Sequence, residues 1–167
     1  MKSDHEIEAC ILHLRRFAMA LTRNVDHADD LVQDTVERAL SRWTLRKPGL
    51  PLRPWLFAIL RNIHISGHRK AVRMVTDHGV DVDHLHSGDA AAEGKMELKQ
   101  VLQMLSALPD DQRMAILLVS VEGFSYAEAS MIMEIPVGTL MSRLNRARKK
   151  LRELVETPPA QRLRRVK

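Results

Sequence analysis

The chain contains a single cysteine, Cys10, among its 167 residues. A lone cysteine rules out an intramolecular disulfide framework and a zinc site built from clustered thiolates, and it is typical of a reducing compartment. No apolar run approaches the ~20 residues that a membrane span requires. The first ten residues, MKSDHEIEAC, lack the apolar segment of a signal peptide. We therefore expect a cytoplasmic protein with no membrane contact of its own.

The sequence also lacks the residue clusters on which enzyme active sites depend. Nucleophilic catalysis needs a serine or cysteine beside a base, and a two-metal site needs several carboxylates aimed at one point. Cys10 lies on an apolar helical stripe, and the histidines are scattered or gathered in one polar segment. We expect no catalytic residue, no cofactor and no enzymatic activity from this chain alone.

Positive charge is present and is unevenly distributed. The chain carries 26 Lys and Arg against 21 Asp and Glu, a formal charge of +5. Residues 51–73 have a net charge of +5 and residues 142–167 of +8, whereas residues 74–141 have −8. Two separated cationic segments suit a polyanion, since each neutralised phosphate releases counterions. Nucleic acid is therefore the leading candidate partner, and two well-solvated helix faces are the alternative.

Hydrophobic periodicity is helical almost throughout, and no run shows the alternation of a half-buried strand. Asp26 is a candidate N-cap for a second helix, and Ser125 with Glu128 forms a candidate capping box. The expected fold class is all-α, with two small helical domains joined by a flexible linker. Its expected parts are an N-terminal domain at 1–73, an acidic linker at 74–94, a C-terminal domain at 95–156 and a basic disordered tail at 157–167.

The expected linker has few large apolar residues and several acidic ones. It includes His78, His84 and His86 among aspartates, which could in principle ligate a divalent metal. A mobile segment lacks the preorganised partners that orient metal ligands. We therefore expect a solvated polar linker and no metal site.

The C-terminal part has the layout of a helix-turn-helix motif, whose second helix lies in the major groove. A short helix, with Ala127, Met131 and Ile132 on its expected inner face, precedes a turn at 135–138 and a long basic helix from Thr139. The long helix divides into two faces. Its apolar face holds Leu140, Leu144, Ala147, Leu151 and Leu154, and its polar strip holds Thr139, Ser142, Arg146 and Lys149. Because an arginine fork matches two acceptors on a guanine edge, this strip favours DNA binding.

Three segments together resemble the bacterial extracytoplasmic-function (ECF) sigma factors of the sigma-70 family. LPDDQRMAILLVSVEGFSYAEASMIMEIPVGTLMSRLNRARKKL, at 108–151, is similar to the domain that reads the promoter −35 element. DDLVQDTVERAL, at 29–40, and LRPWLFAILRN, at 52–62, resemble the other half of that family, in the expected order. Two matching halves are far more specific than a lone helix-turn-helix motif.

The resemblance implies a docking segment for core RNA polymerase in the second helix. It comprises Asp29, Asp30, Leu31, Val32, Gln33 and Asp34. The alternative is that these acids only complement a helix N-terminus, but Gln33 and Asp34 lie beyond the first turn.

The resemblance also implies a surface that binds the −10 element. This surface would hold an unstacked, single-stranded base. Its residues are Trp55, Phe57, Arg61, Asn62, His68, Arg69 and Lys70. An amide with donors and acceptors beside several cations suits a splayed base and its backbone. Trp55 fits a core position better than a stacking platform, and Asn62 is the better candidate for base contact.

Residues of the long helix match positions that approach the −35 element in the family. They are Thr139, Met141, Ser142, Arg143, Asn145, Arg146, Arg148 and Lys149. Met141 stands where some relatives carry a basic residue, and Asn145 stands where others place an aromatic one. Both departures put the −35 sequence preference in doubt.

The resemblance therefore implies an alternative sigma factor that binds core RNA polymerase and promoter DNA and promotes transcription initiation. It also implies an anti-sigma factor as a regulatory partner. Two alternatives remain, a sigma-like mimic that sequesters a regulator without binding DNA and a stand-alone helix-turn-helix repressor. Only the sigma factor would yield specific initiation with core polymerase.

Overall fold

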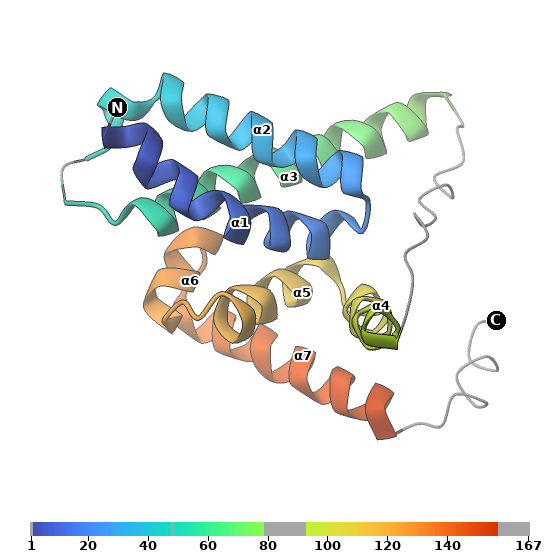
Figure 1. The fold of residues 1–167 in the computed structure, drawn as a ribbon. Helices are drawn as coiled ribbons and strands as arrows, with labels where there is room; N and C mark the ends of the chain where they lie inside the picture. The colour runs from blue at the N-terminus through green and yellow to red at the C-terminus, as the bar shows by residue number, and fades with distance from the viewer. Residues whose placement is uncertain (1, 48, 79–92, 157–167) are drawn as a thin grey trace.

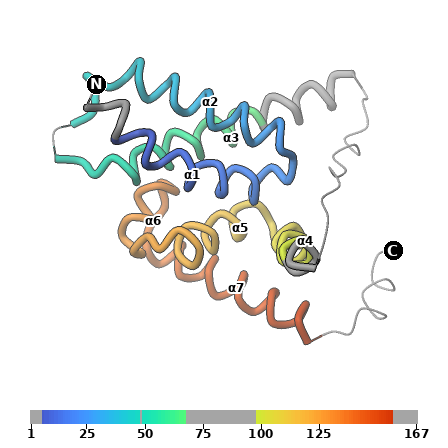
Figure 2. The backbone as a smooth tube through the Cα atoms, in the orientation of Figure 1, coloured from blue at the N-terminus to red at the C-terminus, as the bar shows by residue number. Residues whose placement is uncertain are grey.

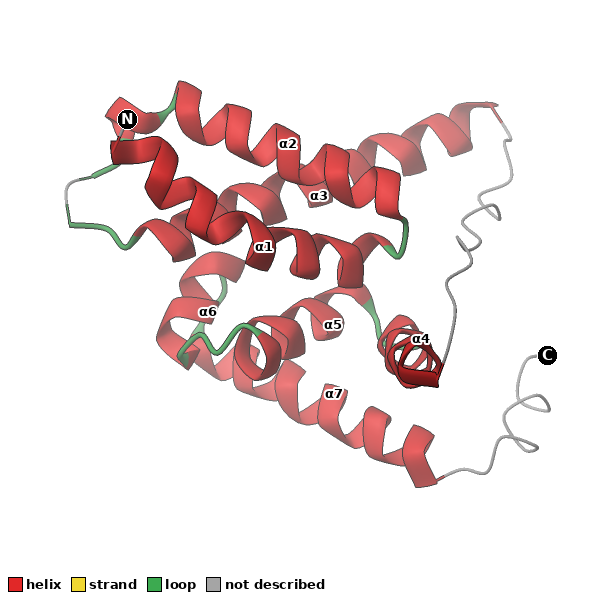
Figure 3. Cartoon of the chain, in the orientation of Figure 1, coloured by secondary structure: helices red, strands yellow, loops and turns green. Residues whose placement is uncertain are grey.

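The computed structural model describes the backbone of residues 2–47, 49–78 and 93–156, and the side chains of residues 6–47, 49–67 and 98–156. These residues are helical with short connections and include no strand, which confirms the all-α fold class (Figures 1 and 3). The α-helices are α1 (Lys2–Thr22), α2 (Val25–Ser41), α3 (Leu52–His78), α4 (Glu93–Ser106), α5 (Asp110–Ile116), α6 (Tyr126–Met133) and α7 (Val137–Glu156). A 3-10 turn, Trp43–Leu45, follows α2, and a π-helical segment, Leu117–Val121, continues α5.

The first three helices pack against one another and form the N-terminal half (Figure 2). The predicted N-cap of α2 is wrong by two residues: Asn24 is the cap, and its side-chain oxygen accepts a hydrogen bond from the His27 amide at 2.9 Å. Asp26 instead lies inside the first turn, where its charge complements the helix N-terminus. The cap fixes where the acidic segment of α2 begins.

Helices α4 to α7 form the C-terminal half. The predicted capping box of α6 is confirmed: the Glu128 amide donates to Ser125 Oγ at 3.2 Å, and the Ser125 amide donates to Glu128 Oε2 at 2.8 Å. On the predicted apolar face of α7, Leu140, Leu144 and Ala147 are buried.

The expected inner face of α6 is partly wrong. Ile132 is buried, but Ala127 is exposed and Met131 is 58% exposed. The buried residues of α6 are Ala129, Ser130, Ile132 and Met133. The reason is that α6 packs against α3 of the other half as well as against α7. A helix held between two neighbours buries a different face from one packed inside its own domain.

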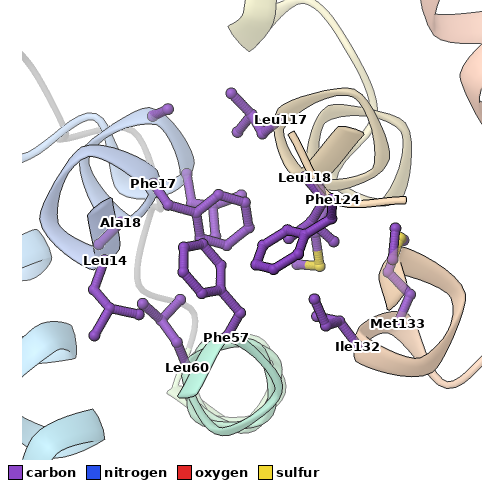
Figure 4. Close-up of a cluster of buried hydrophobic side chains, with 14 of the residues drawn as sticks. Leu14, Phe17, Ala18, Phe57, Leu60, Leu117, Leu118, Phe124, Ile132 and Met133 are labelled. Atoms are coloured by element: carbon purple, nitrogen blue, oxygen red, sulfur yellow. The ribbon is translucent and has the colours of Figure 1, made fainter. Parts of the chain in front are cut away.

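The two halves share one hydrophobic core (Figure 4). Phe57 of α3 lies between Phe17 of α1, with ring centroids 5.1 Å apart, and Phe124 before α6, with centroids 4.9 Å apart. All three side chains are buried. Each of these rings contributes about 1.5–3 kcal/mol when fully buried, so the three of them help to hold the two halves together.

The described helices reach into the range 74–94, which was expected to be a linker. Helix α3 continues through His78, and α4 begins at Glu93. Residues 79–92, which include His84 and His86, and the tail 157–167 lie outside the described residues. Within the described residues, no group of three or more His, Cys, Asp or Glu side chains could hold a metal ion. None of the described helices is long and apolar enough to cross a membrane.

Candidate nucleic-acid and protein-binding surfaces

Helix α7 presents a cationic surface to solvent. Its apolar residues face the core of the C-terminal half, so its polar residues face outward. Seven of the eight side chains predicted to approach the −35 element are exposed: Thr139, Met141, Ser142, Asn145, Arg146, Arg148 and Lys149. Lys150 and Arg152 are exposed beside them and add to the positive charge. Such a surface can bind phosphates along its edges while Arg146 or Asn145 meets base edges.

Two of these predicted DNA-contacting residues already have partners inside the chain. Arg143 is half-buried, and its Nε lies 3.2 Å from Oδ2 of Asp111. The Ser142 hydroxyl donates to the Gly138 carbonyl at 3.0 Å, a side-chain-to-backbone hydrogen bond within the same helix. Arg143 therefore joins α7 to the start of α5, a tie that no motif in the sequence indicates.

The predicted docking residues of α2 differ in their solvent exposure. Asp29, Asp30, Gln33 and Asp34 are exposed, whereas Leu31 and Val32 are buried in the N-terminal half. Asp29 forms a two-point ion pair with Arg15 of α1, at 2.8 Å from Nε to Oδ1 and 3.0 Å from Nη2 to Oδ2. Bidentate pairs of this kind fix orientation as well as charge. The acidic side chains are thus presented on a rigid helix.

A shallow pocket of about 430 Å³ lies between α1 and α2. It is lined by Ile11, Arg15, Asp29, Val32, Gln33, Val36 and Glu37. No motif in the sequence indicates that α1 contributes to this surface, because Ile11 shares an apolar helical stripe with the buried residues Ile7 and Leu14. Ile11 is 38% exposed, and its neighbour Leu12 is 76% exposed. Ile11 therefore adds a partly exposed apolar side chain to a pocket that is also lined by Arg15, Asp29 and Glu37.

The predicted −10 residues of α3 lie at different depths. Phe57 is fully buried between the halves, so it is a core residue in this arrangement. Trp55 is half-buried and packs edge to face on Trp43, with centroids 6.2 Å apart. Asn62 is exposed, and Arg61 is beside it with a side chain 16% exposed. The side chains of His68, Arg69 and Lys70 lie outside the described residues.

A carboxylate from the C-terminal half lies on this pair. Glu134 Oε2 is 3.2 Å from Arg61 Nη1, and Glu134 Oε1 accepts from Asn62 Nδ2 at 3.5 Å. Arg61 Nη1 also donates to Asn62 Oδ1 at 3.0 Å. A small polar cluster therefore crosses the boundary between α3 and α6, and it consists of Arg61, Asn62 and Glu134.

Glu122 is a buried carboxylate with three side-chain partners. Its side chain is fully buried, and one oxygen accepts from Arg16 Nε and Nη2 at 3.0 and 2.9 Å. The other oxygen accepts from Arg53 Nη2 at 2.8 Å and lies 3.0 Å from His13 Nδ1. A buried carboxylate is tolerated only with this degree of compensation. All three of its partners belong to the N-terminal half.

Two buried titratable groups of the described residues have shifted pKa values. Burial raises the pKa of the Cys10 thiol, so the thiol remains protonated and unreactive at neutral pH. Burial lowers the pKa of Arg113, which donates to the carbonyls of Leu105, Leu108 and Leu21 at 2.9, 2.9 and 3.2 Å. Leu21 belongs to α1, so Arg113 links the end of α1 to the start of the C-terminal half.

Comparisons with known proteins identify the family of the chain. The family model for sigma-70 region 4 matches residues 98–151, and that for the Sigma2 domain of PhyR matches residues 7–61. The ECF RNA polymerase sigma factor EcfG of Rhodopseudomonas palustris is 42% identical, over 90% of this chain and 83% of its own.

Two solved structures show how far the likeness extends. The sigma factor RpoE, solved with the anti-sigma factor NepR from Bartonella quintana, is 36% identical with a TM-score of 0.81, over 93% of this chain and 98% of its own. The anti-anti-sigma factor PhyR from the same organism is 20% identical with a TM-score of 0.62, over 91% of this chain and 50% of its own, and shows the fold alone. The chain belongs to the ECF sigma factors of the sigma-70 family.

Proposed function

We propose that this chain is an alternative sigma subunit that binds core RNA polymerase, recognises −10 and −35 promoter elements and promotes transcription initiation. The observation that carries the proposal is the exposed cationic strip of α7, on a scaffold that is 42% identical to an ECF sigma factor. The proposal assigns no chemical reaction to the chain, because polymerase supplies the chemistry. A protein with these partners acts in the cytoplasm.

The −35 element is assigned to α7. Arg146 is exposed near the middle of the helix, where a guanidinium fork can reach a guanine edge. Arg148, Lys149 and Lys150 are exposed cations suited to the flanking phosphates. Arg143 has a positioning role in this proposal, since its pairing with Asp111 ties the helix to α5.

The −10 element is assigned to the exposed end of the α3 surface. Asn62 supplies amide donors and acceptors for a splayed base, and Arg61 supplies a cation for the backbone. Phe57 supports this surface from the core in this arrangement of the two halves. Trp55 contributes through its packing on Trp43.

Core polymerase is assigned to the acidic face of α2 together with the pocket beside it. Asp30, Gln33 and Asp34 are exposed there, and Ile11 and Leu12 of α1 add apolar surface. An apolar centre with a charged rim is the usual anatomy of a protein interface. An anti-sigma factor is the expected regulator, since the similar RpoE was solved in complex with one.

A sigma-like mimic is the second candidate, because the N-terminal family model is named after PhyR, an anti-anti-sigma factor. Identity favours the sigma factor, at 42% with EcfG and 36% with RpoE against 20% with PhyR. A mimic that does not bind DNA would not require the exposed arginine and lysine side chains of α7. A stand-alone repressor would need a dimerisation surface and no polymerase contact.

The deciding experiment mixes the purified full chain with core polymerase and a library of randomised promoter fragments. We expect co-elution with polymerase and new transcripts whose templates share sequence near −35 and −10. The matched control carries Asp30→Ala and Asp34→Ala, which should remove both signals. Co-elution without new transcripts would contradict the promoter-recognition part of the proposal, and failure to co-elute would overturn the sigma assignment.

A further inference from the structure

The first turns of α7, at residues 137–145, offer little charge to DNA. In a helix-turn-helix motif the N-terminal residues of the second helix contact the base edges. Arg143 is the single charged side chain among these residues, and its Nε lies 3.2 Å from Oδ2 of Asp111. The Ser142 hydroxyl is also engaged, since it donates to the Gly138 carbonyl at 3.0 Å. Base contacts from these turns therefore depend mainly on uncharged side chains.

The exposed cations of α7 lie further along the helix. They are Arg146, Arg148, Lys149, Lys150 and Arg152. At 1.5 Å per residue, the first of them is about 13 Å beyond the start of the helix. Cations at such a distance suit the phosphates that flank a groove, together with the guanine edge assigned to Arg146. The charged and uncharged parts of the helix are thus suited to different groups of the DNA.

Two apolar side chains are exposed in the uncharged part. Val137 is 42% exposed and Met141 is 52% exposed. Residues four apart lie one above the other on the same face of a helix, so these two side chains are neighbours. Single exposed apolar residues are ordinary on a protein surface, but this pair lies at the end of the helix that is expected to meet base edges. The exposed Asn145 follows on the same side, one turn further.

The major groove of DNA offers one apolar group that such a pair can recognise. Thymine presents its C5-methyl group there beside the O4 acceptor, whereas the other bases present hydrogen-bond donors and acceptors. A methionine side chain is unbranched and polarizable, so it adapts its shape to a methyl group. Contact between the two removes apolar area from water on both sides. A phosphate, in contrast, gains no hydrogen bond or ion pair from a thioether.

We propose that Met141, supported by Val137, recognises a thymine methyl group in the −35 element and thereby helps to set its sequence preference. This inference rests on the proposed sigma function. Asn145 is about 6 Å further along the helix, which is less than two base-pair steps of about 3.4 Å. The thymine therefore lies within about two base pairs of the base that faces Asn145, whose amide matches an adenine edge.

The test uses the full chain with core polymerase and a promoter duplex selected from a library with a randomised −35 region. Each thymine of the selected region, on either strand, is replaced in turn by deoxyuridine, which lacks only the C5-methyl group. Fluorescence anisotropy gives the dissociation constant of each duplex for the parent chain, Met141→Ala and Met141→Leu. The matched control is Met131→Ala, because Met131 is an equally exposed methionine, at 58%, that lies on α6.

We expect deoxyuridine at one position to weaken binding of the parent chain by about fourfold, as for the loss of one buried methyl group. The Met131→Ala control should keep this loss, and Met141→Leu should keep most of it, because leucine has a similar apolar volume. Met141→Ala should bind the thymine and deoxyuridine duplexes equally. Met141→Lys should also lose the discrimination, and its salt dependence should become steeper by about one unit of slope, since a lysine binds phosphate.

The outcomes separate this inference from the sigma function. A deoxyuridine effect that is present in the parent chain and absent from Met141→Ala supports the methyl contact. The contact is overturned, and the sigma function stands, if the parent chain binds the promoter but tolerates every deoxyuridine, if Met141→Ala keeps the effect, or if the selected −35 region contains no thymine on either strand. If no form binds the promoter with core polymerase, the sigma function is overturned, and the contact is overturned with it.

Discussion

Phe57 of α3 and Phe124, which precedes α6, pack edge to face with their ring centroids 4.9 Å apart. The Arg53 guanidinium lies over both rings, 5.6 Å from the centre of Phe57 and 4.4 Å from that of Phe124. The same guanidinium pairs with Glu122. An apolar contact and an ionic contact between the halves therefore meet at Arg53.

Phe124→Ala should lower the free energy of unfolding by about 3–5 kcal/mol, because it removes a fully packed ring and leaves a cavity between the halves. Urea denaturation followed by circular dichroism measures this change. Val121→Ala is the control, since Val121 is 47% exposed in the same segment and should change stability by less than about 1 kcal/mol. Equal effects of the two substitutions would show that the shared core contributes little.

The capping box of α6 should make stability depend on pH. Hydrogen bonds from Ser125 hold the pKa of Glu128 below its usual value. A carboxyl whose folded pKa is depressed contributes stability that is present above the unfolded pKa and is lost as pH falls through the folded value. The stability difference between the parent chain and Glu128→Gln should therefore be largest at neutral pH and shrink in acid. Urea midpoints between pH 7 and pH 3 measure it, and a difference that grows in acid would contradict this role.

Arg146→Ala should weaken binding to a selected −35 duplex by about 1–3 kcal/mol, if the guanidinium contacts a base edge. Fluorescence anisotropy with the duplex and with a scrambled duplex gives the specific part of the loss. Arg38→Ala is the matched control, because Arg38 is exposed on α2, away from the assigned surface. A loss equal for both duplexes would assign Arg146 to phosphate contact instead.

Asp34→Ala should reduce association with core polymerase by about fivefold or more, as expected for an interface residue worth about 1 kcal/mol. Asp26→Ala removes an exposed acid from the first turn of the same helix and serves as control. Size-exclusion co-elution and a titration by anisotropy of labelled chain report the affinity. If the two substitutions weaken association equally, the acids of α2 act only through the field of the helix.

Part of the candidate site could be predicted from the spacing of residues along the chain, because local sequence patterns determine which face of a helix is buried and how a helix begins. Leu140, Leu144 and Ala147 recur at helical intervals, so the outward face of α7 followed directly from the sequence. Ser125 and Glu128 formed their capping box because that motif depends only on neighbouring backbone. The burial of Phe57 and the inner face of α6 were not predictable in this way, since both depend on a helix from the other half.

The sequence by itself determined the helical class, the charge of each segment and the family, because periodicity, composition and motif order are all properties of the linear chain. Only the tertiary structure decided that the halves close on each other. Glu122 is 69 residues from Arg53 and 106 from Arg16, and Glu134 is 72 from Asn62. Contacts at such separations depend on how two packed surfaces fit, and no local pattern encodes that fit.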